Sequence, residues 1–169
     1  MKPKVALVGY GRMGKEVHEV LKERGYPVVG IIDRGDPLSA MDGADVVVEF
    51  ALPEATLPAL RYAAERGKRY VLGTTGHDEG TMEEIRRLAE RTAVLHSPNF
   101  SRGIALLKVI LRTLLPFVED WDREVFEIHH RWKKDAPSGT ALSLARILGE
   151  RLAINRTGMR RKGEGGVFG

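Results

Sequence analysis

Short apolar runs alternate with amphipathic stretches over the first hundred residues of the chain. A run of about four to eight apolar residues is typical of a buried strand, whereas apolar residues at a period of about 3.6 are typical of a helix. Such alternation predicts βαβ units and a parallel sheet. We expect strands at Lys4–Gly9, Val28–Ile32, Ala44–Phe50, Tyr70–Leu72 and Ala93–His96, and helices at Arg12–Arg24, Pro53–Arg66 and Thr81–Arg91.

A different pattern follows residue 100. Gly103–Phe117 predicts a strongly apolar helix that Pro116 interrupts near its end. Arg123–His129 alternates between apolar and polar residues, which favours a strand with one exposed face. A last helix is expected from Pro137–Thr140 through Arg151.

Together these elements predict an α/β fold: a Rossmann-like, doubly wound parallel sheet with a second, smaller α+β substrate domain. We place the dinucleotide-binding domain at residues 1–100. The domain for substrate binding and oligomerisation is placed at residues 101–169. A length of 169 residues is sufficient for two small lobes.

Composition narrows the functional classes. No Cys occurs, which excludes disulfides, thiolate nucleophiles and Cys-based zinc sites. The apolar run at the N-terminus is broken by glycines and is far shorter than the roughly 20 residues of a membrane span. Nothing like a signal-peptide cleavage region follows it. We therefore expect a cytoplasmic protein with no membrane partner.

The net charge of +4 comes from the end of the chain. Residues 1–150 hold 22 Lys and Arg and 22 Asp and Glu, whereas residues 151–169 hold five basic residues and Glu164 alone. A short basic stretch without interleaved aromatic residues is more often a solvated loop than a nucleic-acid site. We expect no nucleic-acid partner.

Gly9, Gly11 and Gly14 form a GxGxxG motif between the first expected strand and the first expected helix. In this context glycines allow a tight turn, close approach of a pyrophosphate and close helix packing. Arg12 and Met13 lie at the helix start, where the charge of Arg12 can assist pyrophosphate binding. The alternative is a turn with a purely structural role, which the strand before and the helix after make less favourable.

Asp33 ends the second expected strand, where a carboxylate can accept hydrogen bonds from the adenosine ribose hydroxyls. This favours NADH. Arg34 follows directly and can pair with the 2′-phosphate of NADPH, unless it is a solvated surface side chain. Gly73, Thr74 and Thr75, and then Asn99 and Phe100, follow other strands, where they can approach a nicotinamide or merely form loops.

Basic side chains are concentrated between His129 and Lys134, and the sequence Ser138-Gly139-Thr140 follows at the start of an expected helix. Free N–H groups at a helix N-terminus bind anions, and the neighbouring cations suit a second acidic group. The segment therefore predicts a small dicarboxylate substrate. A solvated basic loop is the alternative.

Hydride delivery to an imine or a related ring requires a nearby proton donor. His129 and Lys133 are the candidates for this role, since both side chains can exchange protons. We expect no metal, because no acidic or Cys ligand set accompanies the two adjacent histidines and hydride transfer needs none.

The segment EIHHRWKKDAPSGTA at residues 127–141 is similar to the substrate-domain signature of the 4-hydroxy-tetrahydrodipicolinate reductase (dihydrodipicolinate reductase) family. GYGRMG at residues 9–14, GTTG at residues 73–76 and Asn99-Phe100 extend the resemblance. It implies reduction of 4-hydroxy-tetrahydrodipicolinate to tetrahydrodipicolinate with NADH or NADPH, in lysine and diaminopimelate synthesis. It also implies a cytoplasmic homotetramer.

The same resemblance implies roles for individual residues. His129 is expected to donate or accept a proton and Lys133 to donate one. The implied substrate contacts are His130, Gly139 and Thr140. The implied cofactor contacts are Gly9, Gly11, Arg12, Met13, Gly14, Asp33, Arg34, Gly73, Thr74, Thr75, Ser97, Asn99 and Phe100.

Two features depart from the family pattern. Trp132 stands where a polar residue or another His is common, and the chain stops at Gly169, just after Val167 and Phe168 begin an expected strand. We expect the sequence to be part of a longer protein. Two other functions fit the nucleotide motif: another amino-acid-type dehydrogenase, or a non-catalytic dinucleotide-binding module.

Overall fold

The computed structural model describes residues 1–129 and 137–149. The chain forms two compact units, Met1–Pro98 and Asn99–Gly169, and each is described here by itself. His130, Lys133 and the basic residues from position 150 onward lie outside the described residues.

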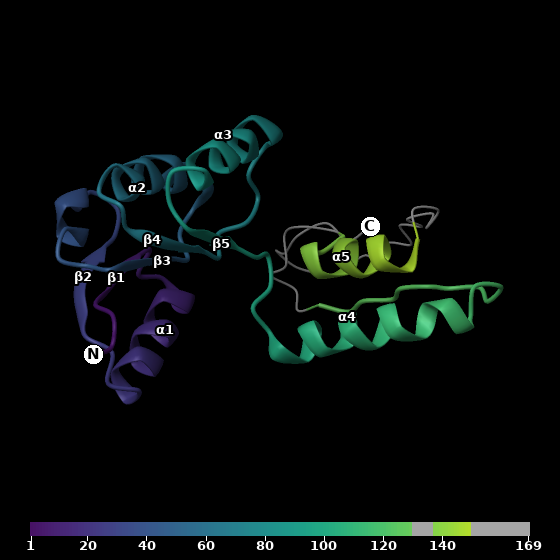
Figure 1. Cartoon of the computed structure of the whole chain (residues 1–169). Coiled ribbons are helices and arrows are strands. Elements are labelled where there is room, and N and C mark those ends of the chain that lie inside the picture. Colours follow the sequence, from purple (N-terminus) through teal and green to yellow (C-terminus); the bar gives the residue numbers. More distant parts are fainter. Residues whose placement is uncertain (130–136, 150–169) are drawn as a thin grey trace, which may run out of the picture. The chain divides into compact units, whose positions relative to one another are not determined.

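The first unit is built on one five-stranded sheet in which every neighbouring pair of strands is parallel (Figure 1). The strand order is β2-β1-β3-β4-β5. All five expected strands are present, which confirms the doubly wound parallel sheet. Their bounds are β1 Val5–Val8, β2 Val28–Ile32, β3 Val46–Glu49, β4 Arg69–Leu72 and β5 Val94–His96.

Helices cover both faces of this sheet, with α1 on one face and α2 and α3 on the other (Figure 1). The core consists of apolar side chains from β1, β3 and β4, together with the inner faces of α2 and α3. Because β1 is central and covered on both sides, all four of its residues are buried. The helix bounds are α1 Arg12–Glu23, α2 Pro53–Glu65 and α3 Glu79–Ala89.

Local signals determine where these helices begin and end. Pro53 occupies the first turn of α2, where its missing N–H costs nothing. The Asp78 side chain accepts a hydrogen bond from the Thr81 N–H, so α3 begins at Glu79, before the expected Thr81. A short 3-10 helix, Leu38–Met41, lies in the segment between β2 and β3.

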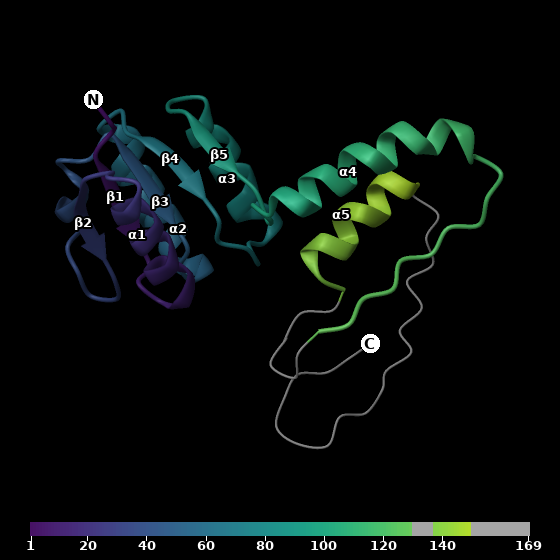
Figure 2. The ribbon, with the colours of Figure 1, turned by 90° about the horizontal axis from the view of Figure 1, so that it is seen from below.

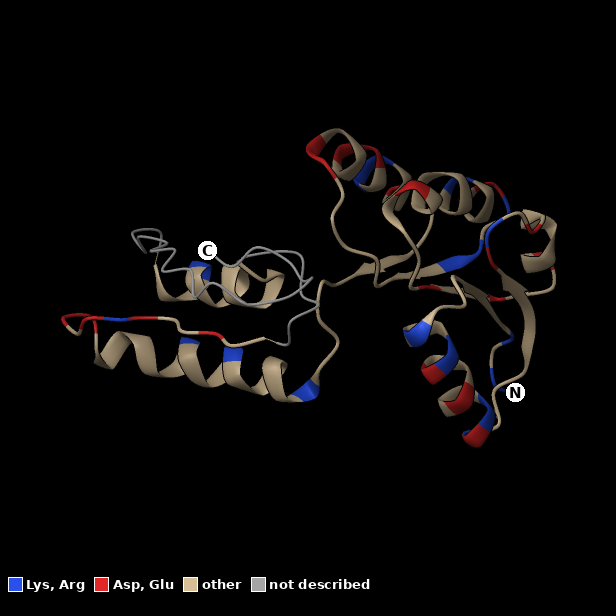
Figure 3. Cartoon of the chain, turned by 180° about the vertical axis from the view of Figure 1, so that it is seen from behind, with Lys and Arg blue, Asp and Glu red and all other residues tan. Residues whose placement is uncertain are grey.

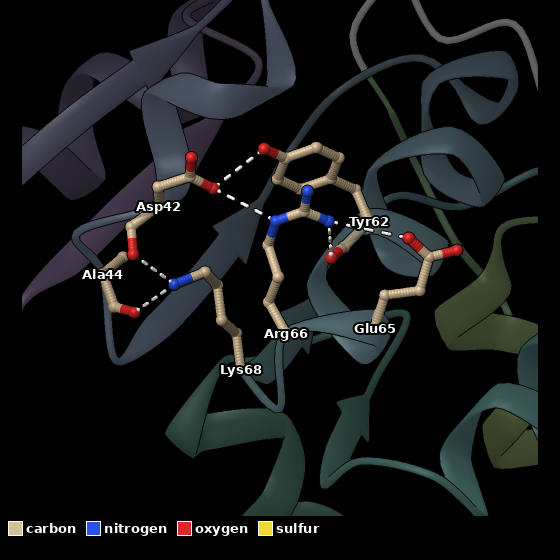
Figure 4. Close-up of polar contacts among 6 residues, drawn as sticks. All are labelled: Asp42, Ala44, Tyr62, Glu65, Arg66 and Lys68. Atoms are coloured by element: carbon tan, nitrogen blue, oxygen red, sulfur yellow. Dashed lines mark hydrogen bonds and ion pairs between the residues drawn. The ribbon is translucent and has the colours of Figure 1, made fainter.

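A polar cluster ties the segment before β3 to α2 and to the start of β4 (Figure 4). The Lys68 ammonium is buried and donates to the carbonyls of Asp42 at 2.5 Å and Ala44 at 2.8 Å. The Asp42 carboxylate accepts from the Tyr62 hydroxyl at 2.8 Å and pairs with Arg66 at 3.3 Å. These contacts lie at the amino ends of the strands and hold that edge of the sheet together.

The second unit contains α4 (Arg102–Leu114), a 3-10 turn (Leu115–Phe117) and α5 (Gly139–Leu148), and α4 and α5 lie side by side (Figures 1 and 2). α5 ends before the expected Arg151, because Gly149 leaves the helical conformation at φ +122°. The expected strand at Arg123–His129 is wrong for the described structure: no ladder partner pairs with it among the described residues.

No helix among the described residues has the length and apolar character needed to span a membrane.

Candidate functional site

The strand order locates a candidate ligand crevice in the first unit. The chain runs from β1 to β2 on one side and then crosses to β3 on the other side of β1. In open parallel sheets of this kind, ligands bind at the carboxyl ends of the strands where the winding direction reverses. That point lies between β1 and β3, and the segment Gly9–Gly14 directly follows β1.

The three motif glycines have different surroundings. Gly9 has φ +87°, and a Cβ there would lie 2.4 Å from the Phe50 carbonyl oxygen. A Cβ on Gly14 would lie 2.0 Å from the Gly9 carbonyl oxygen, so α1 can pack against the end of β1 only with glycine at this position. A Cβ on Gly11 would meet nothing within 4 Å. The fold therefore requires the two outer glycines, whereas the space beside Gly11 is open.

The start of α1 suits an anion. Within the described structure no side chain caps its N-terminus, and its first turn contains no acidic residue. Arg12, Met13 and Lys15 are exposed there. Basic residues, drawn blue in Figure 3, therefore lie at the start of this helix. The N–H groups and the helix dipole favour a negative group at this end, and the two cations add to that preference.

Asp33 lies beside the glycine loop because β1 and β2 are paired. The Gly9 N–H donates to the Ile32 carbonyl at 2.8 Å. The Asp33 carboxylate is exposed and accepts from the Arg34 N–H at 2.9 Å, while the Asp36 carboxylate accepts from the Asp33 N–H at 2.9 Å. This turn fixes Asp33 at the end of β2, where a ribose can reach it. Arg34 is exposed.

The strand-end loop Gly73–Thr75 rests on a buried carboxylate that sequence reasoning missed. Glu49 ends β3 with 0% of its surface exposed. Its carboxylate accepts from the hydroxyls of Thr56 at 2.6 Å, Tyr70 at 2.5 Å and Thr74 at 2.7 Å. The one signal available in the sequence was a charged residue inside the apolar run VVVEF.

Two histidines adjoin this cluster. His77 contacts Thr56 at 2.9 Å and packs edge-on against His96, with ring centroids 6.1 Å apart. Burial lowers the pKa of His96, and so does the neighbouring His77, whereas a backbone hydrogen bond to Thr74 opposes the change. The Ser97 N–H donates to the Leu72 carbonyl at 3.2 Å, which places Ser97 beside the end of β4.

The second unit brings together two other candidate residues. The Asn99 amide donates to the Thr140 hydroxyl at 2.7 Å, and its oxygen accepts from the Ser101 N–H at 2.7 Å. Thr140 lies in the first turn of α5, whose N-cap is Ser138. An expected cofactor residue and an expected substrate residue therefore meet at the N-terminus of α5. Gly139 and Phe100 are exposed.

His129 is held at the same helix end by Glu127, a residue that sequence reasoning did not single out. One Glu127 oxygen accepts from the Ser138 N–H at 2.8 Å; the other accepts from the Ser138 hydroxyl and pairs with His129 Nε2 at 2.8 Å. Burial raises the pKa of Glu127, but the hydrogen bonds from Ser138 and the contact with His129 together bring it below its ordinary value. The spacing of two residues in an extended segment, which puts both side chains on one face, was the missed signal.

The doubly wound sheet, the glycine loop after β1 and the acidic residue after β2 define a Rossmann-like dinucleotide-binding protein. The sequence model described as "Dihydrodipicolinate reductase, N-terminus" matches residues 3–100, and "Dihydrodipicolinate reductase, C-terminus" matches residues 103–168. The chain belongs to the dihydrodipicolinate reductase family.

Relatives named 4-hydroxy-tetrahydrodipicolinate reductase include those of Campylobacter jejuni and Natronomonas pharaonis. The first is 34% identical over 94% of this chain and 66% of its own length, and the second is 35% identical over 95% and 73%. The chain thus spans about two thirds of the length of these relatives. A solved dihydrodipicolinate reductase with bound dipicolinate, from Paenisporosarcina sp. TG-14, matches with a TM-score of 0.68 at 25% identity, over 97% of this chain and 72% of that one.

Proposed function

We propose that the protein reduces 4-hydroxy-tetrahydrodipicolinate to tetrahydrodipicolinate with NADH or NADPH and releases water, in diaminopimelate and lysine synthesis. The observation that carries this proposal is the grouping of His129, Glu127 and Ser138 at the N-terminus of α5. Family membership and the relatives' names support the same reaction. The two alternative functions, another amino-acid-type dehydrogenase and a non-catalytic module, would not require this grouping.

The first unit is the proposed dinucleotide-binding domain. Its glycine loop receives the pyrophosphate at the N-terminus of α1, with Arg12 and Met13 beside it. Asp33 accepts from ribose hydroxyls, and Arg34 pairs with the 2′-phosphate when NADPH is bound. The proposed contacts of the nicotinamide end are Gly73, Thr74, Thr75, Ser97, Asn99 and Phe100.

The second unit is the proposed substrate-binding domain. The substrate is a small dicarboxylate, and one carboxylate is bound by the first N–H groups of α5, with Gly139 giving it close access. The Thr140 hydroxyl adds a hydrogen bond, and Asn99 orients it through the contact at 2.7 Å. His130 is proposed for the other acidic group.

Bound NAD(P)H supplies the hydride in this reaction. The chain supplies the proton, from Lys133 or His129. The Glu127 carboxylate accepts a hydrogen bond from His129 Nε2, so Nε2 carries a proton. The other ring nitrogen, Nδ1, is directed away from Glu127.

A homotetramer in the cytoplasm is proposed, with no nucleic-acid or membrane partner. Association is supported by the exposed apolar side chains of the second unit, among them Leu106 at 60%, Val109 at 57% and Phe117 at 80%. Light scattering of the purified protein tests this part, and a mass equal to a single chain contradicts it.

Two variants test the proton-transfer roles. His129→Gln and Lys133→Ala are each expected to lower kcat at least about a hundredfold with freshly prepared substrate, because general acid catalysis contributes roughly 10² to 10⁴. NADH binding in the absence of substrate is the control and should not change. Unchanged rates in both variants would refute the assignment.

A further inference from the structure

A buried polar cluster adjoins the loop Gly73–Thr75, and of its members only Thr74 has a part in the proposed function. It consists of Glu49, Thr56, Tyr70 and Thr74, whose exposed fractions are 0%, 0%, 1% and 4%. Every buried side-chain nitrogen and oxygen in the described part of the chain has a hydrogen-bond partner. A fully satisfied buried network of this kind rigidifies the structure around it.

The number of protons that each side chain can donate determines the direction of each hydrogen bond in the cluster. Glu49 receives three hydroxyl donors on its two oxygens, so it acts as an acceptor only, which is the role of a carboxylate. The hydroxyls of Thr56 and Thr74 each give their single proton to Glu49 Oε1. Thr56 must therefore accept from His77 Nε2, and Thr74 accepts from the Ala51 N–H at 2.9 Å.

Thr74 is consequently held by two hydrogen bonds. Its hydroxyl is bonded to Glu49 at the end of β3 and to the Ala51 N–H in the loop after β3. A residue so restrained fixes the conformation of Gly73–Thr75 before any ligand arrives, and such preorganisation increases affinity by reducing the entropy lost on binding.

We propose that Glu49 is a positioning residue for the dinucleotide: through Thr74 it fixes the loop Gly73–Thr75 in its cofactor-binding conformation. The inference rests on the proposed function, which assigns this loop to the nicotinamide end. A purely structural Glu49 would affect the stability of the fold and nothing else.

Tyr70 provides a matched control. Its hydroxyl bonds to Glu49 Oε2, whereas the Thr74 hydroxyl bonds to Glu49 Oε1. Glu49→Leu has a similar size and removes both carboxylate oxygens, so the Thr74 hydroxyl loses its acceptor. Tyr70→Phe also leaves a buried group short of one hydrogen bond, so both variants should lower Tm.

The measurement is the Kd for NADH by titration calorimetry, in the absence of substrate, with Tm as the parallel readout. Glu49→Leu is expected to raise Kd about tenfold, the equivalent of one lost hydrogen bond. Tyr70→Phe should stay within about twofold of the wild type. Equal effects of both variants on Kd would overturn the proposal.

A double variant tests whether Glu49 affects NADH binding through Thr74 or through other residues. Thr74→Val keeps the side-chain shape but removes the hydroxyl, so adding Glu49→Leu to it should change Kd by less than about twofold. If the two effects multiply instead, Glu49 does not act through Thr74. Should Glu49→Leu fail to fold, Thr74→Ser and Thr74→Val decide, since only the second loses the hydroxyl; equal Kd values would overturn the proposal. A folded wild type that binds neither NADH nor NADPH would overturn the proposed function itself.

Discussion

At the residue scale, Gly11 and Gly14 are equivalent positions of the GxGxxG motif, but their surroundings in the structure differ. Gly14 touches the carbonyl of Gly9, whereas the position of a Cβ on Gly11 is open. Packing therefore requires glycine at position 14, whereas the role of Gly11 in binding the pyrophosphate is our proposal.

Alanine substitutions separate these two requirements. Gly14→Ala should destabilise the fold by about 1–3 kcal/mol, the usual cost of overpacking, because its methyl group would lie 2.0 Å from a carbonyl oxygen. Gly11→Ala should leave Tm unchanged and weaken NADH binding at least about tenfold, because the methyl group enters the space of the pyrophosphate. Thermal unfolding and NADH titration check both. Equal losses of stability would contradict this distinction.

Glu127 is predicted to make stability depend on pH in the acid range. Its folded-state pKa lies below the ordinary value of 4.5, so the unfolded chain takes up a proton first as the pH falls. The stabilisation is present above the unfolded value and is lost as pH falls through the folded value.

Glu127→Gln cannot take up this proton. Urea unfolding at about pH 7 and about pH 4 should show a smaller loss of stability in this variant than in the wild type. The variant should also lower kcat about tenfold, because His129 loses its carboxylate partner. The same loss of stability in both proteins would contradict the assigned pKa shift.

Distance along the chain explains why Glu49 was not found from the sequence. Its hydroxyl partners lie 7, 21 and 25 residues away, and only the parallel pairing of β3 with β4 brings Tyr70 and Thr74 to it. The glycine motif and Asp33 were recognisable because their spacing is local. The roles proposed for all of these residues remain predictions.

At the element scale, the strands and helices of the first unit were predictable because each carries its own periodicity and end signals. The apolar run Val5–Val8 is buried at every position, as the centre of a parallel sheet requires. Arg123–His129 was not predictable in the same way, because alternation alone gives an extended segment and a strand also needs a paired neighbour. The 3-10 helix Leu38–Met41 was not predictable, because it has no periodic signal. Its effect on the sequence is seen only at Gly30, where a Cβ would lie 1.9 Å from the Ala40 carbonyl oxygen.

The Lys68 contacts shown in Figure 4 predict a strong effect on stability. Lys68→Met keeps most of the aliphatic stem but removes both hydrogen bonds, to the carbonyls of Asp42 and Ala44. The free energy of unfolding should fall by about 1–3 kcal/mol, because the buried Ala44 carbonyl and the part-buried Asp42 carbonyl lose a charged donor. Denaturant unfolding measures it.

Glu65 supplies the control for this prediction. It pairs with Arg66 at 3.6 Å, and both side chains are largely exposed. Glu65→Gln should change the free energy of unfolding by less than about 0.5 kcal/mol, as is usual for exposed ion pairs. Comparable losses in the two variants would show that the buried ammonium has no special role.

At the scale of the whole molecule, family membership and the doubly wound fold agree with what the sequence predicted. The two compact units, Met1–Pro98 and Asn99–Gly169, fall close to the ranges matched by the two family models, residues 3–100 and 103–168. The division of labour between them, with dinucleotide in the first and dicarboxylate in the second, is our proposal.

The most direct test is to add freshly prepared 4-hydroxy-tetrahydrodipicolinate to the purified protein with NADH or NADPH and follow oxidation of the cofactor. The account predicts oxidation that depends on the substrate, with one cofactor consumed for each tetrahydrodipicolinate found by mass spectrometry. A folded protein that binds the cofactor but oxidises none of it beyond the rate without substrate would contradict the account.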